Sequence, residues 1–284
     1  MAAERVRRVG WATLCAGLAM LVLAAAGGAA TRVGIGKMTV TPNRVPAGST
    51  NDFTFGFLAD TAAVRGTTLV DVPRGWSKPQ RTSASAPGYF ELQALGCPGT
   101  RISGISGRRV VIATKCARGQ SFKLVYHRGV APQISADGFV FLTQTRPANA
   151  PRKTRFKPLG PRKQAVVRVR GTVVAGLFMT VTSVATAGQA FNATVRAVDA
   201  FGNNAADYAG TVTLTSTDPK ATMPAPYAYG PTDVAQHTFT GLVLRTLGTQ
   251  RLTATDSHGF TVQSGPITVS AFSTWASPSA RRRS

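Results

Sequence analysis

The sequence contains few acidic residues. Only 11 Asp and Glu stand against 33 Lys and Arg in 284 residues, so the formal net charge is +22. A charge of this size predicts contact with polyanionic partners or surfaces, and it carries no information about fold. Glu91 is the only glutamate after residue 30, which leaves little material for general acid–base catalysis.

Histidines and catalytic motifs are scarce as well. His127, His237 and His258 lie far apart in the sequence and lack the spacing of metal ligands. The chain has no HExxH, GxSxG or glycine-rich phosphate-loop motif. We therefore expect a protein that is not an enzyme and that binds no cofactor and no metal.

Cysteine occurs three times, at Cys15, Cys97 and Cys116. Cys15 lies in the apolar N-terminal segment, which leaves Cys97 and Cys116 as the only pair in the rest of the chain. In an exported protein such a pair predicts one disulfide. The alternative is two free, buried thiols in a cytosolic protein.

The N-terminal residues 1–30 predict export. Three arginines within the first eight residues precede a long uncharged run that ends in small residues, which is the order of a secretory signal peptide. Cleavage would follow Ala26 or Ala30. The run is also close to the length that spans a bilayer, so an uncleaved anchor is the alternative. Either reading places the protein outside the cell or on its surface.

Long helical patterns are missing after residue 31, and short strand patterns replace them. β-branched and aromatic runs recur between glycines and prolines, about seven of them before residue 171 and a second series after it. This spacing predicts an all-β chain of two β-sandwiches, over residues 31–171 and 172–272, followed by a basic tail over residues 273–284.

The second series resembles the immunoglobulin-like modules of bacterial secreted and cell-surface proteins. The resemblance rests on "VDAFGN" at residues 198–203 and on the later "LGTQRLTATD". Residues 31–170 are more loosely similar to exported sandwich domains, through "TVTPNRVPAGSTNDFTFGF" and "VDVPRGWSKPQ". The resemblance implies two Ig-like domains and a binding or adhesion role, and it says almost nothing about the ligand.

A basic segment, "PRKTRFKPLGPRK", occupies residues 151–163 and contains no acid. Its prolines predict a segment outside helix and sheet interiors, with solvated and unpaired charges. If residues 164–170 close the first sandwich, as the resemblance implies, the segment is a loop of that domain; otherwise it is a linker. Its six cations are the candidate polyanion-binding residues: Arg152, Lys153, Arg155, Lys157, Arg162 and Lys163.

The positive charge is concentrated in this part of the chain. Residues 138–198 contain ten cations and no acid, whereas residues 199–272 contain three cations and five acids. We expect the partner to be an anionic wall polymer, lipid head groups or an acidic polysaccharide, with possible peripheral membrane contact. Because Phe156 is the only aromatic residue in the segment, sequence-specific nucleic-acid binding is not expected. The alternative is a structural spacer or accessory subunit in which the charge is only compositional.

Two further features have two interpretations each. Four oxygen-bearing residues fall at predicted strand corners, where they would either bind Ca²⁺ or stabilise turns. A tryptophan between Arg74 and Lys78 belongs either to the core or to an exposed aromatic platform, while a second one lies in the C-terminal tail. The residues concerned are Asp199, Asn203, Asp218 and Asp256, and Trp76 and Trp275.

Overall fold

A computed structural model describes residues 33–151 and 153–272. The predicted signal or anchor segment, Cys15, Trp275 and the basic tail lie outside the described residues. In the described part of the chain no helix is long and apolar enough to cross a membrane. Its regular structure is strand apart from two single-turn 3₁₀ helices, so the prediction of an all-β chain built of β-sandwiches is confirmed. The predicted domain boundaries stay predictions.

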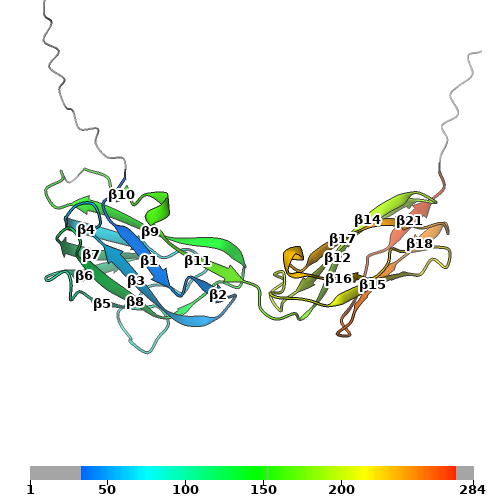
Figure 1. Cartoon of the computed structure of the whole chain (residues 1–284), viewed down its shortest axis with the longest axis horizontal. Coiled ribbons are helices and arrows are strands. Elements are labelled where there is room, and N and C mark those ends of the chain that lie inside the picture. The colour runs from blue at the N-terminus through cyan, green and yellow to red at the C-terminus, as the bar shows by residue number, and fades with distance from the viewer. Residues whose placement is uncertain (1–32, 152, 273–284) are drawn as a thin grey trace, which may run out of the picture. The chain divides into compact units, whose positions relative to one another are not determined.

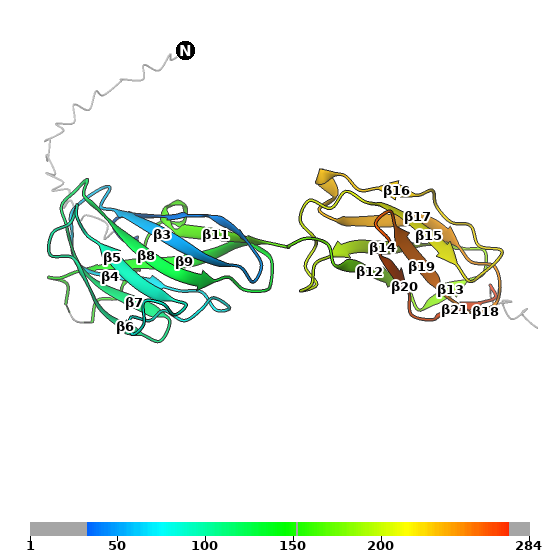
Figure 2. The same cartoon turned by 90° about the horizontal axis from the view of Figure 1, so that it is seen from below.

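The first sandwich consists of two sheets (Figures 1 and 2). Aromatic side chains from both sheets form its core. One sheet has the order β1-β3-β8-β5; the other has the order β2-β11-β9-β4-β7-β6, with β10 added beside β9. The strands are β1 (Lys37–Thr41), β2 (Arg44–Pro46), β3 (Thr50–Leu58), β4 (Val64–Asp71), β5 (Tyr89–Gln93), β6 (Arg101–Ser106), β7 (Arg109–Cys116), β8 (Ser121–Val130), β9 (Ala136–Pro147), β10 (Lys157–Pro158) and β11 (Ala165–Arg170); the 3₁₀ turn η1 spans Pro161–Lys163.

Alternation along the strands builds this core. In β3 three phenylalanines at every second position are fully buried, and the inward positions of β8 pack beside them. Phe55 lies 4.8 Å from Phe141 of the opposite sheet, measured between ring centroids. Trp76 is 3% exposed and contacts Phe53, Phe139 and Phe141 edge-on. It therefore belongs to the core and forms no exposed platform.

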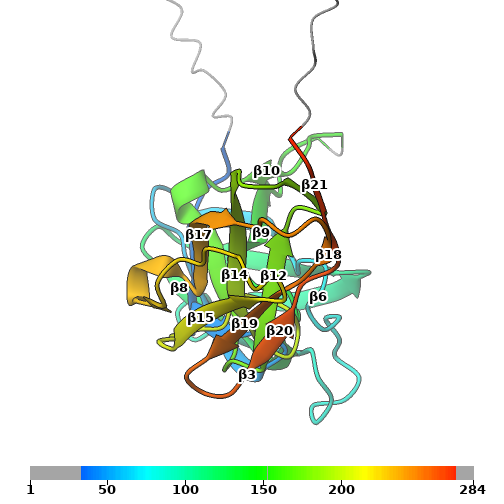
Figure 3. The same cartoon turned by 90° about the vertical axis from the view of Figure 1, so that its right-hand side faces the viewer.

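The second sandwich repeats the way in which the first one begins. In both, the first strand is split, and its second piece pairs in parallel with the last strand, β2 with β11 and β13 with β21. Figure 3 shows β19 beside β20 and β12 beside β14. Its elements are β12 (Gly176–Val181), β13 (Val184–Thr186), β14 (Ala190–Val198), β15 (Thr211–Ser216), β16 (Tyr227–Ala228), η2 (Pro231–Asp233), β17 (Gln236–Val243), β18 (Gly248–Gln250), β19 (Leu252–Asp256), β20 (Thr261–Gln263) and β21 (Ile267–Ser270).

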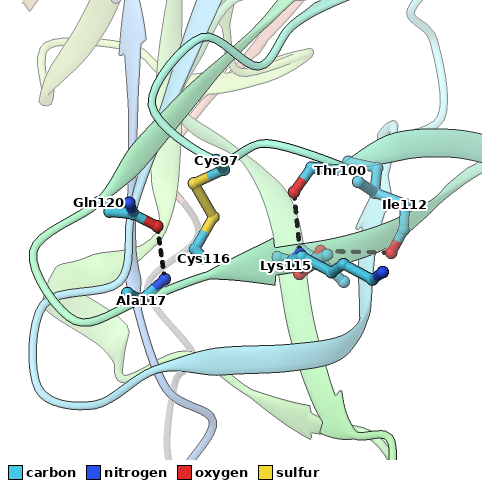
Figure 4. Close-up of a disulfide and its surroundings, with 9 residues drawn as sticks. Cys97, Thr100, Ile112, Lys115, Cys116, Ala117 and Gln120 are labelled. Atoms are coloured by element: carbon cyan, nitrogen blue, oxygen red, sulfur yellow. Dashed lines mark hydrogen bonds between the residues drawn. A yellow bond between two sulfur atoms is a disulfide. The ribbon is translucent and has the colours of Figure 1, made fainter.

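One disulfide joins Cys97, in the loop after β5, to Cys116 at the end of β7 (Figure 4). Both cysteines are completely buried. The predicted disulfide is therefore confirmed, and the interpretation as free thiols is wrong. Thr100, in the same loop, accepts a hydrogen bond from the amide of Lys115 at 2.9 Å. The disulfide and this hydrogen bond together fasten the loop to the last two residues of β7.

Removal of the disulfide tests its contribution to stability. The paired variant Cys97→Ala/Cys116→Ala opens a loop of sequence separation 19, and we expect its free energy of unfolding to fall by about 3 kcal/mol, because the unfolded chain regains loop entropy. Urea unfolding followed by circular dichroism measures the loss. Alkylation of either cysteine in the native protein before reduction would contradict the pairing.

Candidate functional site

The basic segment is a loop of the first sandwich, because the strand that follows it, β11, pairs with both β9 and β2. The loop is fastened at its second half. Lys157 and Pro158 pair with Thr145 and Gln144 of β9 as the short strand β10. The side chain of Gln164 accepts a hydrogen bond from the amide of Thr143 at 2.8 Å and donates one to the carbonyl of Leu159 at 2.9 Å.

This attachment agrees with the prediction that the segment lies outside sheet interiors, because residues 157–158 join the seven-stranded sheet only as a two-residue strand beside β9. Proline is tolerated there because β10 is an edge strand whose outer side needs no amide donor. The loop is consequently held against the sheet at a fixed place, and only its first half projects.

The six predicted cations divide into two groups. Lys153, Arg155 and Arg162 are exposed, whereas Lys157 and Lys163 are half-buried. Arg152 lies outside the described residues. The Nζ atom of Lys163 lies 2.6 Å from Oδ2 of Asp60, just after β3, so the prediction of six unpaired charges is wrong for Lys163. Burial acts to raise the pKa of Asp60, but the bonds from Lys163 and from Thr61 outweigh it and lower this pKa.

Phe156 fixes the projecting half of the loop. The guanidinium of Arg146, near the end of β9, lies 4.3 Å from the centroid of the Phe156 ring, a cation–π contact. This face of the ring is therefore occupied by a side chain of the same protein. The loop contributes charge at this position, and Phe156 serves as an anchor.

Three strand cations, which sequence reasoning missed, lie on the sheet to which this loop is attached. Lys115 of β7 pairs with Arg65 of β4, and two residues earlier Ala113 pairs with Arg101 of β6. Opposite residues, and residues two apart in a strand, share one face of a sheet. The intervening residues of β7 point into the core. Arg65, Arg101 and Lys115 are exposed, so all three lie on the outer face of the seven-stranded sheet.

Arg146 belongs to the same face. It pairs with Thr67 of β4, and Thr67 in turn pairs with Ala113 of β7. Neighbouring strands are ~4.8 Å apart, so Arg101 and Arg146 are separated by about 14 Å across four strands. We call the four strand cations and the exposed loop cations together the basic surface: Arg65, Arg101, Lys115 and Arg146, with Lys153, Arg155 and Arg162.

Two carboxylates of the first sandwich are already bound by cations within the described residues. Asp71 is bound by Arg109 at 2.7 Å toward the other end of β4 and β7, and Asp60 is bound by Lys163. Within residues 33–151 and 153–272, no carboxylate lies within 4.0 Å of Arg65, Arg101, Lys115, Lys153, Arg155 or Arg162. The first sandwich, residues 31–171, contains 23 Lys and Arg and five Asp and Glu.

The acidic strand corners of the second sandwich are explained by turn chemistry. Asp199 accepts hydrogen bonds from the amides of Phe201 and Asn203, and Asp256 accepts them from His258 and Phe260. Both turns thus use the same donors, two and four residues after the aspartate. Both also place a glycine of positive φ, +81° at Gly202 and +89° at Gly259, three residues after it.

Asp218 forms the third corner. It is 3% exposed and accepts hydrogen bonds from the amides of Lys220, Arg245 and Thr246 and from the hydroxyl of Thr246. Burial acts to raise the pKa of Asp218, but these donors outweigh it and hold the pKa well below the usual range. In the described part of the chain, no three His, Cys, Asp or Glu residues are placed to hold a metal ion.

The three histidines have separate surroundings. His127 lies 3.2 Å from Asp52 and 3.1 Å from Glu91, bridging strands β3 and β5 across β8. His237 stacks on Tyr227 with 3.4 Å between ring centroids, and His258 lies 3.3 Å from Asp256. The first contacts join neighbouring strands, the stacking joins β17 to β16 of the other sheet, and the last completes a turn, so each has a structural explanation.

No protein-family model and no curated protein sequence matches this chain. Among solved structures, the ICAM-5 D1–D4 ectodomain fragment matches over 86% of this chain and 52% of its own, at 16% identity and TM-score 0.26. Parabacteroides merdae β-glucuronidase matches over 81% and 24%, at 8% identity and TM-score 0.28, and a marsupial T cell receptor over 83% and 72%, at 10% identity and TM-score 0.26.

The chain thus spans about half the length of the ICAM-5 fragment. With TM-scores of 0.26 to 0.28, none of these likenesses supports an inference about the partners of this chain. The sandwich architecture rests on the strands and their pairing.

The corner aspartates make the second sandwich sensitive to acid. The pKa values of Asp199, Asp218 and Asp256 are lowered by folding, so their contribution is complete above the unfolded pKa of ~3.9 and is lost as pH falls below it. We expect Asp218→Asn to lower the free energy of unfolding by about 2 kcal/mol at pH 7 and to weaken its dependence on pH below 4. Urea unfolding at pH 7, 4 and 3 measures both effects.

Asp207→Asn is the matched control, because Asp207 is an exposed aspartate of the same sandwich. Equal stability of the Asp207 and Asp218 variants would show that the carboxylate of Asp218 is not needed to hold its corner.

Proposed function

We propose that this protein is an exported binding or adhesion module that contacts anionic polymers or head groups of the cell envelope, or an acidic polysaccharide, through the basic surface of its first sandwich. The proposed activity is binding without catalysis, and it requires no cofactor and no metal. The buried disulfide fits a protein that folds in an oxidising, extracellular environment.

The observation that carries the proposal is the combination of exposure and absent partners. Lys153, Arg155 and Arg162 are exposed on a loop whose base is fastened to β9. Because no carboxylate pairs with them in the described residues, their field is not cancelled locally. Fixed, solvated cations of one sign attract polyanions over roughly a Debye length, about 8 Å at physiological salt.

The structure also bears on the type of contact. Phe156 is already covered on one face by Arg146, and Trp76 is buried in the core. Base stacking needs free aromatic faces, so sequence-specific recognition of nucleic acid is not proposed. The interaction we propose is electrostatic and depends strongly on salt.

Neutralisation of the loop tests the proposal. In the loop variant, Arg152, Lys153, Arg155 and Arg162 are replaced by Gln, while Lys157 and Lys163 are retained because both are part of the loop's attachment. We expect the slope of log affinity for heparin against log salt to fall by about three, since each lost contact removes 0.7 to 0.9. Isothermal titration at two salt concentrations measures the slope.

The control removes the same charge elsewhere. This opposite-end control uses four exposed arginines: Arg44 at the start of β2, Arg168 and Arg170 in the second half of β11, and Arg74 just after the end of β4. Replacing these four by Gln gives the same net charge as the loop variant. Equal binding by the two variants would show that only total charge matters. If the wild-type protein binds neither heparin nor wall polymer, the structural spacer is favoured.

A further inference from the structure

The strand cations and the loop cations are parts of one continuous array. Phe156, at the end of the projecting half of the loop, packs against Arg146 of β9. The loop therefore contacts the sheet at the strand cation nearest to it. From there, the row formed by Arg146, Thr67, Ala113 and Arg101 crosses β9, β4, β7 and β6. Arg65 and Lys115 form a second, parallel pair closer to the ends of β4 and β7.

The array continues around the end of the sandwich. After β10 the chain enters the turn η1, where Lys163 binds Asp60 at 2.6 Å. Asp60 follows β3, which belongs to the four-stranded sheet. Arg162 is the exposed neighbour of Lys163 in this turn. The basic surface therefore extends from the outer face of the seven-stranded sheet to the turn η1, which Lys163 links to the end of β3 in the four-stranded sheet.

The shape of the array distinguishes between possible partners. A planar bilayer cannot contact the cations of the sheet face and those of the turn η1 at the same time. A flexible linear polymer bends and meets cations on both sides. The register places Arg65 directly opposite Lys115, about 5 Å away. Arg146 lies diagonal to Arg65 and Arg101 lies diagonal to Lys115, each about 7 to 8 Å away. The four strand cations thus form a row of short steps, which suits a chain with repeated charges.

On the basis of the proposed function, we infer that the partner is a flexible linear polyanion that lies across β6, β7, β4 and β9 and continues along the loop to Arg162. Its recognition requires repeated phosphate or carboxylate groups and no particular base or sugar. The outer sheet face contributes as much to this binding as the loop does.

The test compares three variants with a long linear polyphosphate as the probe. The face variant replaces Arg65, Arg101 and Lys115 by Gln and keeps Arg146, which packs on Phe156. The loop variant is the one defined above, and the third variant combines the two. All three are made in the full-length chain, and urea unfolding verifies that each variant is folded.

Each contact makes affinity fall about threefold when salt is raised fourfold. We therefore expect the fourfold rise in salt to weaken binding by the face variant roughly 20- to 40-fold less than binding by the wild type, because three contacts are lost. For the loop variant, which loses four contacts, the difference should be roughly 50- to 150-fold. For the combined variant, the difference should be the product of the two. A phosphate oligomer shorter than about 14 Å cannot span the four strands, so its binding should respond to each variant only weakly.

The outcomes separate this inference from the proposed function. Full loss in the loop variant with an unchanged face variant would overturn the continuous array and leave the proposed function standing. Binding to vesicles containing phosphatidylglycerol, without binding to the linear polymer, would replace the polymer by a membrane surface. If no variant differs from the opposite-end control, both the array and the proposed function are wrong.

Discussion

The placement of β11 in the first sandwich is the constraint on which the candidate site depends. Because residues 165–170 pair with β9 on one side and with β2 on the other, the chain must return to the sheet that it left at Pro147. The basic segment is therefore closed at both ends. A linker between domains would have had no fixed neighbour, whereas this loop has the outer ends of β9 and β4 beside it.

Much of the fold follows from the sequence, since the inward phenylalanines of β3 and the alternating run of β7 predict strands with one buried face. Changes of sheet within a run do not follow from it. The run "QRLTATD" has the composition of a single strand, yet it begins in β18 and continues as β19, in different sheets, with only Arg251 between them. Likewise "LFMTVTSV" ends one strand, β12, and enters β13 in another sheet. Alternation reports a buried face and carries no information about the neighbouring strand.

The candidate site was predicted only in part, because the sequence does not show which strands are neighbours. The loop cations are consecutive in the sequence, so their clustering is visible there. Arg65, Arg101 and Lys115 are far apart in the sequence and meet only through strand register, which depends on tertiary packing. The contact of Lys163 with Asp60 joins residues 103 positions apart, and nothing in the local sequence distinguishes this lysine from its exposed neighbour Arg162.

The positive charge reflects missing acids as much as added cations. Charged residues make up 15% of the chain, against about 25% in ordinary globular proteins. Of the ten acidic residues in residues 33–272, eight have a side chain that forms a hydrogen bond or an ion pair. Most of the acidic residues therefore stabilise a turn or link strands. A uniform shortage of acids would leave both sandwiches basic. Residues 199–272 nevertheless contain five acids and only three cations. The charge is thus a local property of the first sandwich, which favours recognition over a habit of composition.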